Sequence, residues 1–299
     1  MPHHDPISTS AGYLSDIGIQ LLRSGTVTGA TVLVYDYFCT LEQEVELIWS
    51  NPFGLASIMF LVNRYAPFVD TFLSVNMSFN PAITAEQCAI QTRAVSWLMT
   101  IGIVHSELIL MLRTYALWGR RRSILILLTF LAVGFLIPAI ILTKLEVSSE
   151  HFIAFHGCHI STAKNIIFLA FCLLTVYETL LSILTAVQAC KHLRQTRSPW
   201  VTKLYKDGLV YYFYLLVLSC TNIVFYRLAP AFGPWLATLQ RIMYSVFCNR
   251  VLFLIIQGNS GSAYGVGRRR DIETGSELPV VTLTEILETD IFEDISEDM

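Results

Sequence analysis

The chain has 299 residues, of which 54% are hydrophobic and 14% are charged, and its formal net charge is −3. Soluble globular domains carry about 25% charged residues. This composition, with a mean hydropathy of +0.56, argues against an ordinary soluble domain and indicates a membrane protein. The net charge excludes little by itself, because acidic and basic residues are segregated along the chain.

The chain opens on residues 1–23, which we expect to be an extracellular or lumenal segment. The start of this segment lacks a basic n-region and an apolar h-region, so we expect no cleaved signal peptide. A membrane-spanning helix needs about 20 mostly apolar residues. The stretches that meet this need are Ser24–Leu41, Phe53–Val75, Cys88–Leu112, Ser123–Thr143, Asn165–Ala189, Gly208–Leu228 and Trp235–Gln257.

These candidate spans differ in strength. Ser123–Thr143 carries no charge, whereas Ser24–Leu41 is short and contains Asp36. A soluble all-α bundle is the alternative, but its helices would show a polar stripe, and the fourth and sixth candidates show none. We therefore predict an all-α fold, a polytopic membrane bundle with seven transmembrane helices over residues 24–257.

Lysine and arginine in the short loops predict the orientation, because cytoplasmic loops are enriched in these residues. One side of the predicted membrane is strongly basic and holds Arg113, Arg120, Arg121, Arg122, Lys191, Arg194, Arg197, Lys203, Lys206 and Arg268–Arg270. The other side holds Arg23, Lys144 and Lys164, with Arg227 near its boundary. We expect an outer N-terminus and a cytoplasmic C-terminus, in the plasma membrane or an endomembrane.

Two features of the predicted outer side agree with this orientation. Asn76 begins a glycosylation sequon between the second and third spans. Cys88 and Cys158 are the natural outer cysteine pair and predict a disulfide, with two unpaired thiols as the alternative. On the inner side, Cys190 is either a palmitoylation site or an inert thiol at the membrane edge.

An acidic run, YDYFCTLEQEVELIW at positions 35–49, joins the inner end of the first span to the first cytoplasmic loop. Because the inner surface opposite it is basic, we expect one of its glutamates to pair with an arginine of the second loop. The glutamates are Glu42, Glu44 and Glu46, and the arginines are Arg113, Arg120, Arg121 and Arg122. A solvated acidic loop is the alternative.

This run also carries a resemblance. Together with the segment RTYALWGRRR after the third span, it is similar to a family of multi-span membrane proteins from mushroom-forming fungi. The family is catalogued as domain of unknown function 6533, and the similar region covers about residues 24–75 and 113–118. The resemblance implies a fungal integral membrane protein and supplies no catalytic or binding residues.

Charged residues inside the spans are costly in hydrocarbon and usually face a partner within the bundle. Sorted by depth, they form an outer layer of Asp70, Arg93 and Arg241, a middle layer of Arg64 and Glu178, and an inner layer of Asp36, Glu107 and Arg250. We expect Asp70 to pair with Arg93. The layers are either structural pairs that hold the helices in register, or a ligand site, an ion path or a switch.

We predict no catalytic, cofactor or metal site. His151, His156, Cys158 and His159 lie close in the sequence, but they lack the paired spacing of a structural zinc site. No nucleophile elbow, phosphate loop or nucleic-acid signature occurs in the sequence. We therefore expect no enzyme activity and no nucleic-acid partner.

Residues 258–299 form a predicted cytoplasmic tail that becomes acidic after its three arginines, and we expect it to be disordered. Thr274 and Thr282 each have a glutamate three positions on, as in acid-directed phosphorylation sites. The apolar and acidic residues of VVTLTEILETDIFEDI are a candidate for a helix that forms on a partner. A merely solubilising tail is the alternative.

Four classes of function compete. Seven spans, an outer N-terminus and an acidic inner tail favour a receptor-like or sensory protein, whose partners are the lipid bilayer and a cytoplasmic signalling protein at the basic loops and tail. The similarity to G-protein-coupled receptors is one of fold only, because LRTYALW has no acid before its arginine. A transporter or channel using the buried charges is the main alternative. A membrane-embedded enzyme and a scaffold follow.

Overall fold

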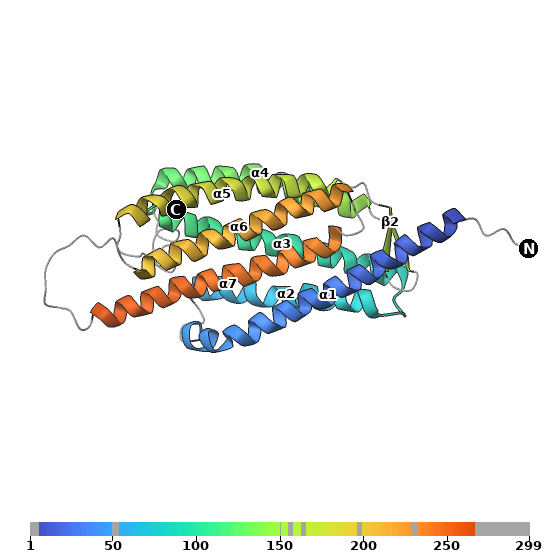
Figure 1. Ribbon diagram of the computed structural model, residues 1–299, viewed down its shortest axis with the longest axis horizontal. Coiled ribbons are helices and arrows are strands. Elements are labelled where there is room, and N and C mark those ends of the chain that lie inside the picture. Colours follow the sequence, from blue (N-terminus) through green and yellow to red (C-terminus); the bar gives the residue numbers. More distant parts are fainter. Residues whose placement is uncertain are drawn as a thin grey trace, which may run out of the picture.

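The structure is a computed structural model that describes residues 6–49, 54–149, 151–154, 158–162, 166–195, 199–228 and 233–266. Its helices are α1 (Pro6–Leu47), α2 (Leu55–Phe79), α3 (Ala85–Leu117), α4 (Arg122–Ser149), α5 (Ile167–Gln195), α6 (Pro199–Leu228) and α7 (Gly233–Val266). The helices lie side by side in one elongated bundle (Figure 1). The predicted helical fold is confirmed, and each predicted span falls on one helix.

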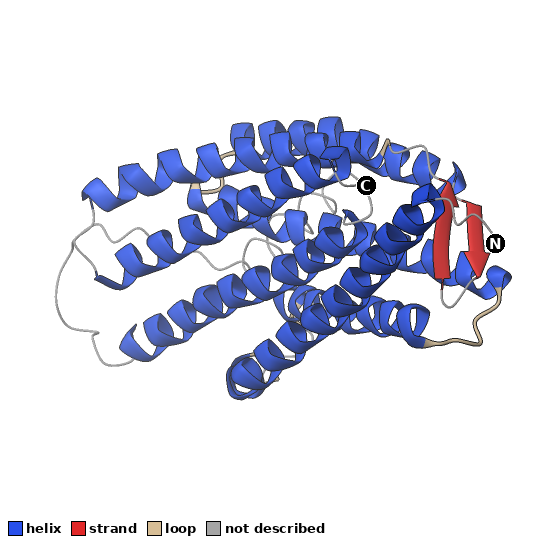
Figure 2. Ribbon diagram, turned by 45° about the vertical axis from the view of Figure 1, so that its right-hand side comes forward, coloured by secondary structure: helices blue, strands red, loops and turns tan. Residues whose placement is uncertain are grey.

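A short hairpin is the exception to the helical pattern. Strands β1 (His151–Ala154) and β2 (Cys158–Thr162) pair antiparallel between α4 and α5. The hairpin lies at the same end of the bundle as the start of α1 and the loop from α2 to α3 (Figure 2). These segments therefore lie together at one end of the bundle.

The helix ends follow local sequence signals. Thr84 caps α3 by accepting a hydrogen bond from the Gln87 backbone N–H at 3.2 Å, and the Gln87 side chain accepts from the Thr84 N–H. This reciprocal pair is a capping box. At the other end of α3, Gly119 has a φ of 66°, which glycine adopts at little cost. The turn places the basic segment Arg120–Arg122 at the end of the bundle opposite the hairpin.

The first helix departs from the expectation. We expect a span that begins at Ser24, but α1 begins at Pro6 and continues to Leu47. Proline is well suited to the first turn of a helix, because its missing N–H would have no partner there. The C-terminal extension has a consequence for the site, because it makes the acidic run helical as far as Leu47. At the other end of the chain, α7 continues to Val266, so residues 258–266, which we expected in the disordered tail, are helical. The rest of the expected tail, with Thr274 and Thr282, lies outside the described residues.

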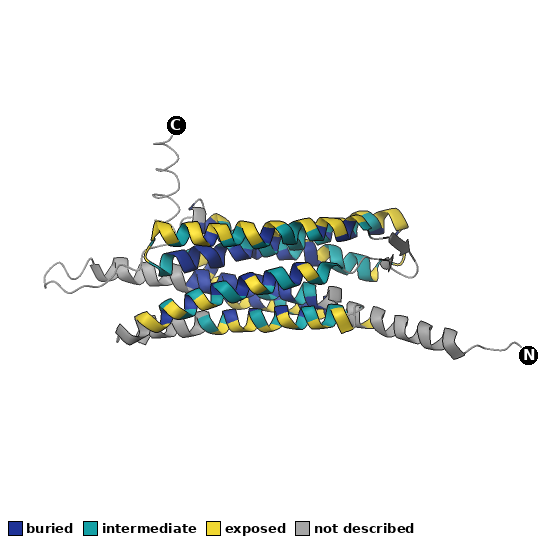
Figure 3. Cartoon of the chain, turned by 90° about the horizontal axis from the view of Figure 1, so that it is seen from above, coloured by how far each residue is buried: buried dark blue, intermediate teal, exposed yellow. Residues whose placement is uncertain are grey.

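Helices α3 and α7 hold the bundle together. Helix α3 contacts α2, α4, α5 and α7 as well as both strands, and α7 contacts α1, α2, α3 and α6. Helix α7 therefore closes the ring between α6 and α1, with α3 inside it. Figure 3 shows the buried residues gathered along the helices that face the middle of the bundle.

The bundle is polar inside and apolar outside at many positions. Arg64 and Arg241 are among its largest fully buried side chains, whereas Phe72, Phe130 and Leu228 are 73%, 74% and 81% exposed. Large exposed apolar side chains over a buried polar interior are unfavourable in water and favourable in lipid. The surface therefore agrees with a membrane environment.

By length and composition, four helices of the described part of the chain are able to cross a membrane. The segments are Ala85–Leu117, Arg122–Ser149, Ile167–Lys191 and Leu209–Leu228, which belong to α3, α4, α5 and α6. Their apolar character and the apolar surface of the bundle indicate an integral membrane protein.

Candidate functional site

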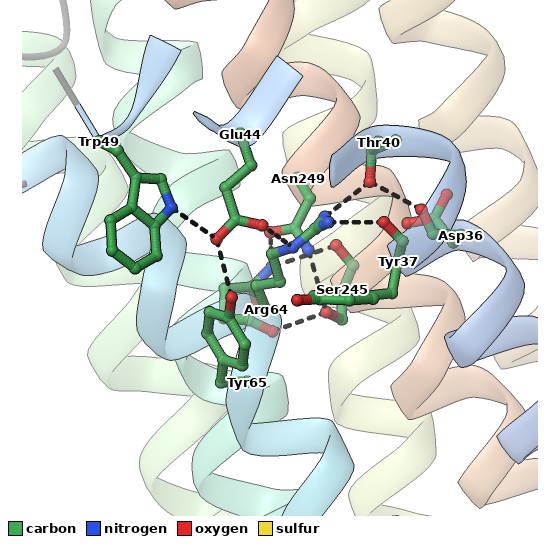
Figure 4. A network of polar contacts seen from close by, with 10 residues as sticks. Asp36, Tyr37, Thr40, Glu44, Trp49, Arg64, Tyr65, Ser245 and Asn249 are labelled. Carbon is green, nitrogen blue, oxygen red and sulfur yellow. Dashed lines mark hydrogen bonds and ion pairs between the residues drawn. The ribbon is translucent and has the colours of Figure 1, made fainter. Parts of the chain in front are cut away.

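The acidic run at positions 35–49 forms one polar face of α1. Asp36, Thr40 and Glu44 are four residues apart, so they lie above one another on the helix. All three are buried, whereas Glu42 and Glu46 are exposed. The buried face points toward α2 and α7 (Figure 4).

Arg64 of α2 is the centre of this region. Its Nε lies 2.6 Å from Glu44 Oε2, and the two side chains are 2% and 0% exposed. The remaining guanidinium nitrogens donate to Thr40 Oγ1 at 2.7 Å and to the Tyr37 carbonyl at 3.0 Å. Figure 4 shows Arg64 enclosed by these groups of α1. The buried cation is therefore held by a charge and two neutral acceptors.

The second oxygen of Glu44 is also occupied. Tyr65 donates its hydroxyl to Glu44 Oε1 at 2.8 Å, and the Trp49 indole N–H donates to the same oxygen at 3.3 Å. Trp49 follows the end of α1 and is 61% exposed, as is usual for tryptophan at a membrane–water boundary. Glu44 thus ties the end of α1 to α2 and to the start of the first loop.

A second ion pair joins α1 to α7. Arg250 donates to Asp36 Oδ1 from Nη2 at 2.7 Å and from Nε at 3.0 Å. Asp36 is buried, but the Arg250 side chain is 43% exposed, so water or headgroups screen this pair more than the Arg64–Glu44 pair.

Asn63 extends the polar contacts to α7 and α3. It donates to the Ser245 carbonyl at 3.1 Å and to Asn249 Oδ1 at 2.9 Å, while Ser245 Oγ donates to the Asn63 carbonyl at 2.6 Å. Ser106 of α3 donates to Asn63 Oδ1 at 2.8 Å. We call the whole set the α1–α2–α7 network; it comprises Asp36, Thr40, Glu44, Asn63, Arg64, Tyr65, Ser245, Asn249 and Arg250.

The network is tightly packed. The cavity between its helices, lined by residues including Asp36, Arg64 and Asn249, measures about 10 Å³. A single water needs about this much space, so the site has room for one water and not for an organic ligand. The arrangement therefore holds the helices together. Removing one partner of the buried Arg64–Glu44 pair leaves the other charge unpaired, which costs about 3–5 kcal/mol.

Much of this network lies in a segment shared with other proteins. Residues 26–69 match the model of a family described as Family of unknown function (DUF6533). The chain carries a DUF6533 segment. The family resemblance of the acidic run is confirmed, and the DUF6533 segment contributes every member of the network from α1 and α2. No curated protein and no solved structure matches the chain.

The outer charge layer differs from the expectation. Arg241 takes the place expected for Arg93: its Nε lies 3.5 Å from Asp70 Oδ2, and both side chains are buried. Arg93 is exposed on α3. Arg93 and Arg241 were both expected at the depth of Asp70. Of the two, only Arg241 faces the interior of the bundle.

The middle and inner layers are also rearranged. Arg64 pairs with Glu44 rather than with Glu178, which instead accepts a hydrogen bond from Ser219 at 2.8 Å. Glu107 accepts from Tyr244 at 2.7 Å. In the inner layer, the structure brings Asp36 and Arg250 together.

The expected pairing between the first two loops takes another form. Glu44 meets an arginine, but this arginine is Arg64 of α2 instead of one from the second loop. Arg113 lies in the bundle, with its guanidinium carbon 6.0 Å from the centre of the Tyr212 ring. Because α1 continues through the acidic run, Glu44 faces the bundle rather than the second loop.

The structure describes some of the cysteines and the sequon that the sequence singled out. Cys88 is disulfide-bonded, and α3 contacts β2, but the side chain of Cys158 lies outside the described residues, so the pairing stays a prediction. Asn76 lies within α2, and its side-chain N–H donates a hydrogen bond to Gln91 Oε1 at 3.0 Å. A glycan on the same nitrogen would displace this contact. Cys190 is an exposed free cysteine near the end of α5.

The sequence did not single out five network residues, namely Thr40, Asn63, Tyr65, Ser245 and Asn249. It also did not single out Tyr37, Trp49 and Ser106, which form hydrogen bonds to the network. One signal for them exists in the sequence. Ser245 and Asn249 are four apart on α7, as are Asp36, Thr40 and Glu44 on α1. Polar residues at helical spacing on two apolar helices predict contact between the helices, because each polar face needs a partner in hydrocarbon.

Proposed function

We propose that the protein is a seven-span membrane protein with an outer N-terminus and a cytoplasmic C-terminus, and that it acts as a receptor-like signalling protein. The positions of the loops support this orientation. The hairpin and the α2–α3 loop lie at one end of the bundle, and the basic α3–α4 turn lies at the other (Figure 1). The basic end is the cytoplasmic one by the positive-inside rule.

One observation carries the receptor-like role. Helix α3 contacts the hairpin at one end, contacts four other helices along its length and ends at the basic turn. An outer ligand that shifts the hairpin would therefore act on a helix that reaches the inner face. A rigid, packed helix between two sites is one kind of element that carries coupling, and α3 is such a helix.

The α1–α2–α7 network gives this bundle a defined resting state. Ser106 of α3 contacts Asn63, so a movement of α3 reaches the network directly. The network in turn holds α7 against α1 through Arg250 and Asp36. Release of this pair is the step by which we propose that α7 moves toward a cytoplasmic partner.

The test has two parts. Epitope tags at the two ends of the chain are probed in intact and permeabilised cells, and opposite accessibility is expected. Proteins held by the inner face are then captured from membranes with the wild-type chain and with Arg250→Gln. A heterotrimeric G protein or another signalling protein, captured in different amounts by the two chains, supports the proposal. Tags on the same face contradict it.

A transporter is the second candidate, because Glu107 and Glu178 are buried in the middle of the bundle. Acids at such a depth often carry protons or ions in transporters. Flux measured in vesicles that contain the purified protein distinguishes the two candidates. A flux that Glu178→Gln abolishes, without loss of folded protein, favours transport over signalling.

A further inference from the structure

Two acids in the middle of the bundle differ from the acids of the α1–α2–α7 network. Glu107 of α3 and Glu178 of α5 are 0% and 3% exposed. Asp36, Glu44 and Asp70 each form an ion pair with an arginine, but Glu107 and Glu178 form none within the described residues. They also interact electrostatically with each other. Two buried acids therefore share one region without a paired cation.

The hydrogen bonds fix which oxygen of each acid is an acceptor. Gln240 donates to Ser219 Oγ at 2.6 Å, so the single proton of Ser219 is free to go to Glu178 Oε1, 2.8 Å away. Tyr244 donates its hydroxyl to Glu107 Oε1 in the same way. In each acid one oxygen accepts, and the other oxygen, Oε2, is buried without a hydrogen-bond partner among the described groups.

The Tyr177 hydroxyl is a third unsatisfied group in this region. It is 0% exposed and has no hydrogen-bond partner in the part of the chain that the structure describes. It interacts electrostatically with Glu107 and neighbours Glu178 in the chain. The region thus offers two carboxyl oxygens and a hydroxyl whose hydrogen-bonding capacity is unused.

The charged and titratable groups around the acids come from α3, α5, α6 and α7. They are Arg113 of α3, Tyr177 of α5, Tyr212 of α6, and Arg241, Tyr244 and Cys248 of α7. Of the two arginines, Arg241 is paired with Asp70 and Arg113 lies against the Tyr212 ring. A carboxylate buried without a paired cation is strongly unfavourable, and binding a proton removes the charge.

We propose that Glu107 and Glu178 form a proton-binding site in the middle of the bundle, with protons held on their Oε2 atoms at neutral pH. When a proton binds Oε2, the carboxylate becomes a neutral carboxylic acid, and Oε1 keeps the hydrogen bond from Tyr244 or Ser219. When both protons leave, two negative charges lie in the same buried region, one on α3 and one on α5. The site therefore makes the packing of these helices depend on protonation, whether the protein signals or transports.

Infrared spectroscopy tests the site without any assay of signalling or flux. The full-length protein in lipid nanodiscs is measured at neutral pH in H₂O and D₂O, and a carboxylic acid C=O band that shifts in D₂O is expected. Glu107→Gln and Glu178→Gln should each lower the band, and the double variant should abolish it. Glutamine keeps the size and the acceptor oxygen of each acid, so these variants are expected to fold.

Glu44→Gln is the matched control, because Glu44 is equally buried but paired with Arg64. It should leave the band unchanged. Absence of the band in the wild-type protein, or its survival in the double variant, overturns the proposal. Loss of the band on addition of Na⁺ at constant pH also overturns it, since the site would then take sodium. If the double variant does not fold, the two single variants decide by the same criterion.

Discussion

Arg64 of α2 lies 2.6 Å from Glu44 of α1, and the two side chains are almost completely buried. Three further groups of α1 and its loop complete the site: Thr40 and Tyr37 accept from Arg64, and Trp49 donates to Glu44. The acidic run at the end of the first helix is therefore an internal counter-charge for a buried arginine. Its place in the DUF6533 segment makes this pair the natural first target for mutation.

Arg64→Met should destabilise the protein by about 3–5 kcal/mol, because it leaves Glu44 buried without its cation. The double variant Arg64→Met with Glu44→Gln should lose less than the sum of the two single changes. Unfolding in detergent or nanodiscs measures both. Glu42→Gln is the control, since this exposed acid should change stability by less than about 0.5 kcal/mol. Additive single and double effects would show that the pair has no energetic role.

Gly102→Ala should destabilise the bundle by about 1–3 kcal/mol, because a methyl group there would overlap the Arg241 guanidinium. Gly134→Ala is a matched control on α4, where a methyl group meets no atom within 4 Å. That change should be neutral or stabilising by about 0.5–1 kcal/mol, because alanine favours a helix. Thermal unfolding compares the two variants, and equal effects would mean that Arg241 does not pack on Gly102.

Arg250→Gln should cost only about 1 kcal/mol, since its pair with Asp36 is half exposed and therefore screened. The cost should shrink further at high salt, whereas the cost of Arg64→Met should hardly change. Unfolding measured at low and high ionic strength gives both values. A loss for Arg250→Gln as large as that for Arg64→Met would place both pairs in the same dry interior.

Cys88 should be recovered in a peptide crosslinked to Cys158 when the protein is digested under non-reducing conditions. Cys172, a free cysteine of α5, is the control and should be alkylated without reduction. Mass spectrometry of the two digests decides the pairing. Alkylation of Cys158 without reduction would assign Cys88 a different partner.

The sequence anticipated the helices far better than their contacts. Apolar stretches such as Ser123–Thr143 predict a helix by themselves, because crossing a bilayer is a property of one local segment. The charged residues within the spans were also recognisable, since each stands out against its apolar neighbours. Their depth followed from position along the helix, and depth alone was not enough to select partners.

Asp70 shows which information the sequence lacked for choosing partners. Arg93 and Arg241 are similar to it in depth, yet only Arg241 faces the interior. Rotation of each helix about its own axis decides this, and rotation depends on packing against several neighbours at once. The same holds for Glu44, whose burial required α1 to extend through the acidic run to Leu47.

By itself, the sequence determined that the protein is a membrane bundle of helices with charges inside it. Hydropathy and charge are local properties, and each segment shows them without reference to its neighbours in space. Only the tertiary structure decided that Glu44 meets Arg64, that Arg241 meets Asp70 and that Glu107 and Glu178 form no ion pair with an arginine of the described segments. Those outcomes depend on which helices are neighbours and which faces they present. No single segment of the chain contains that information.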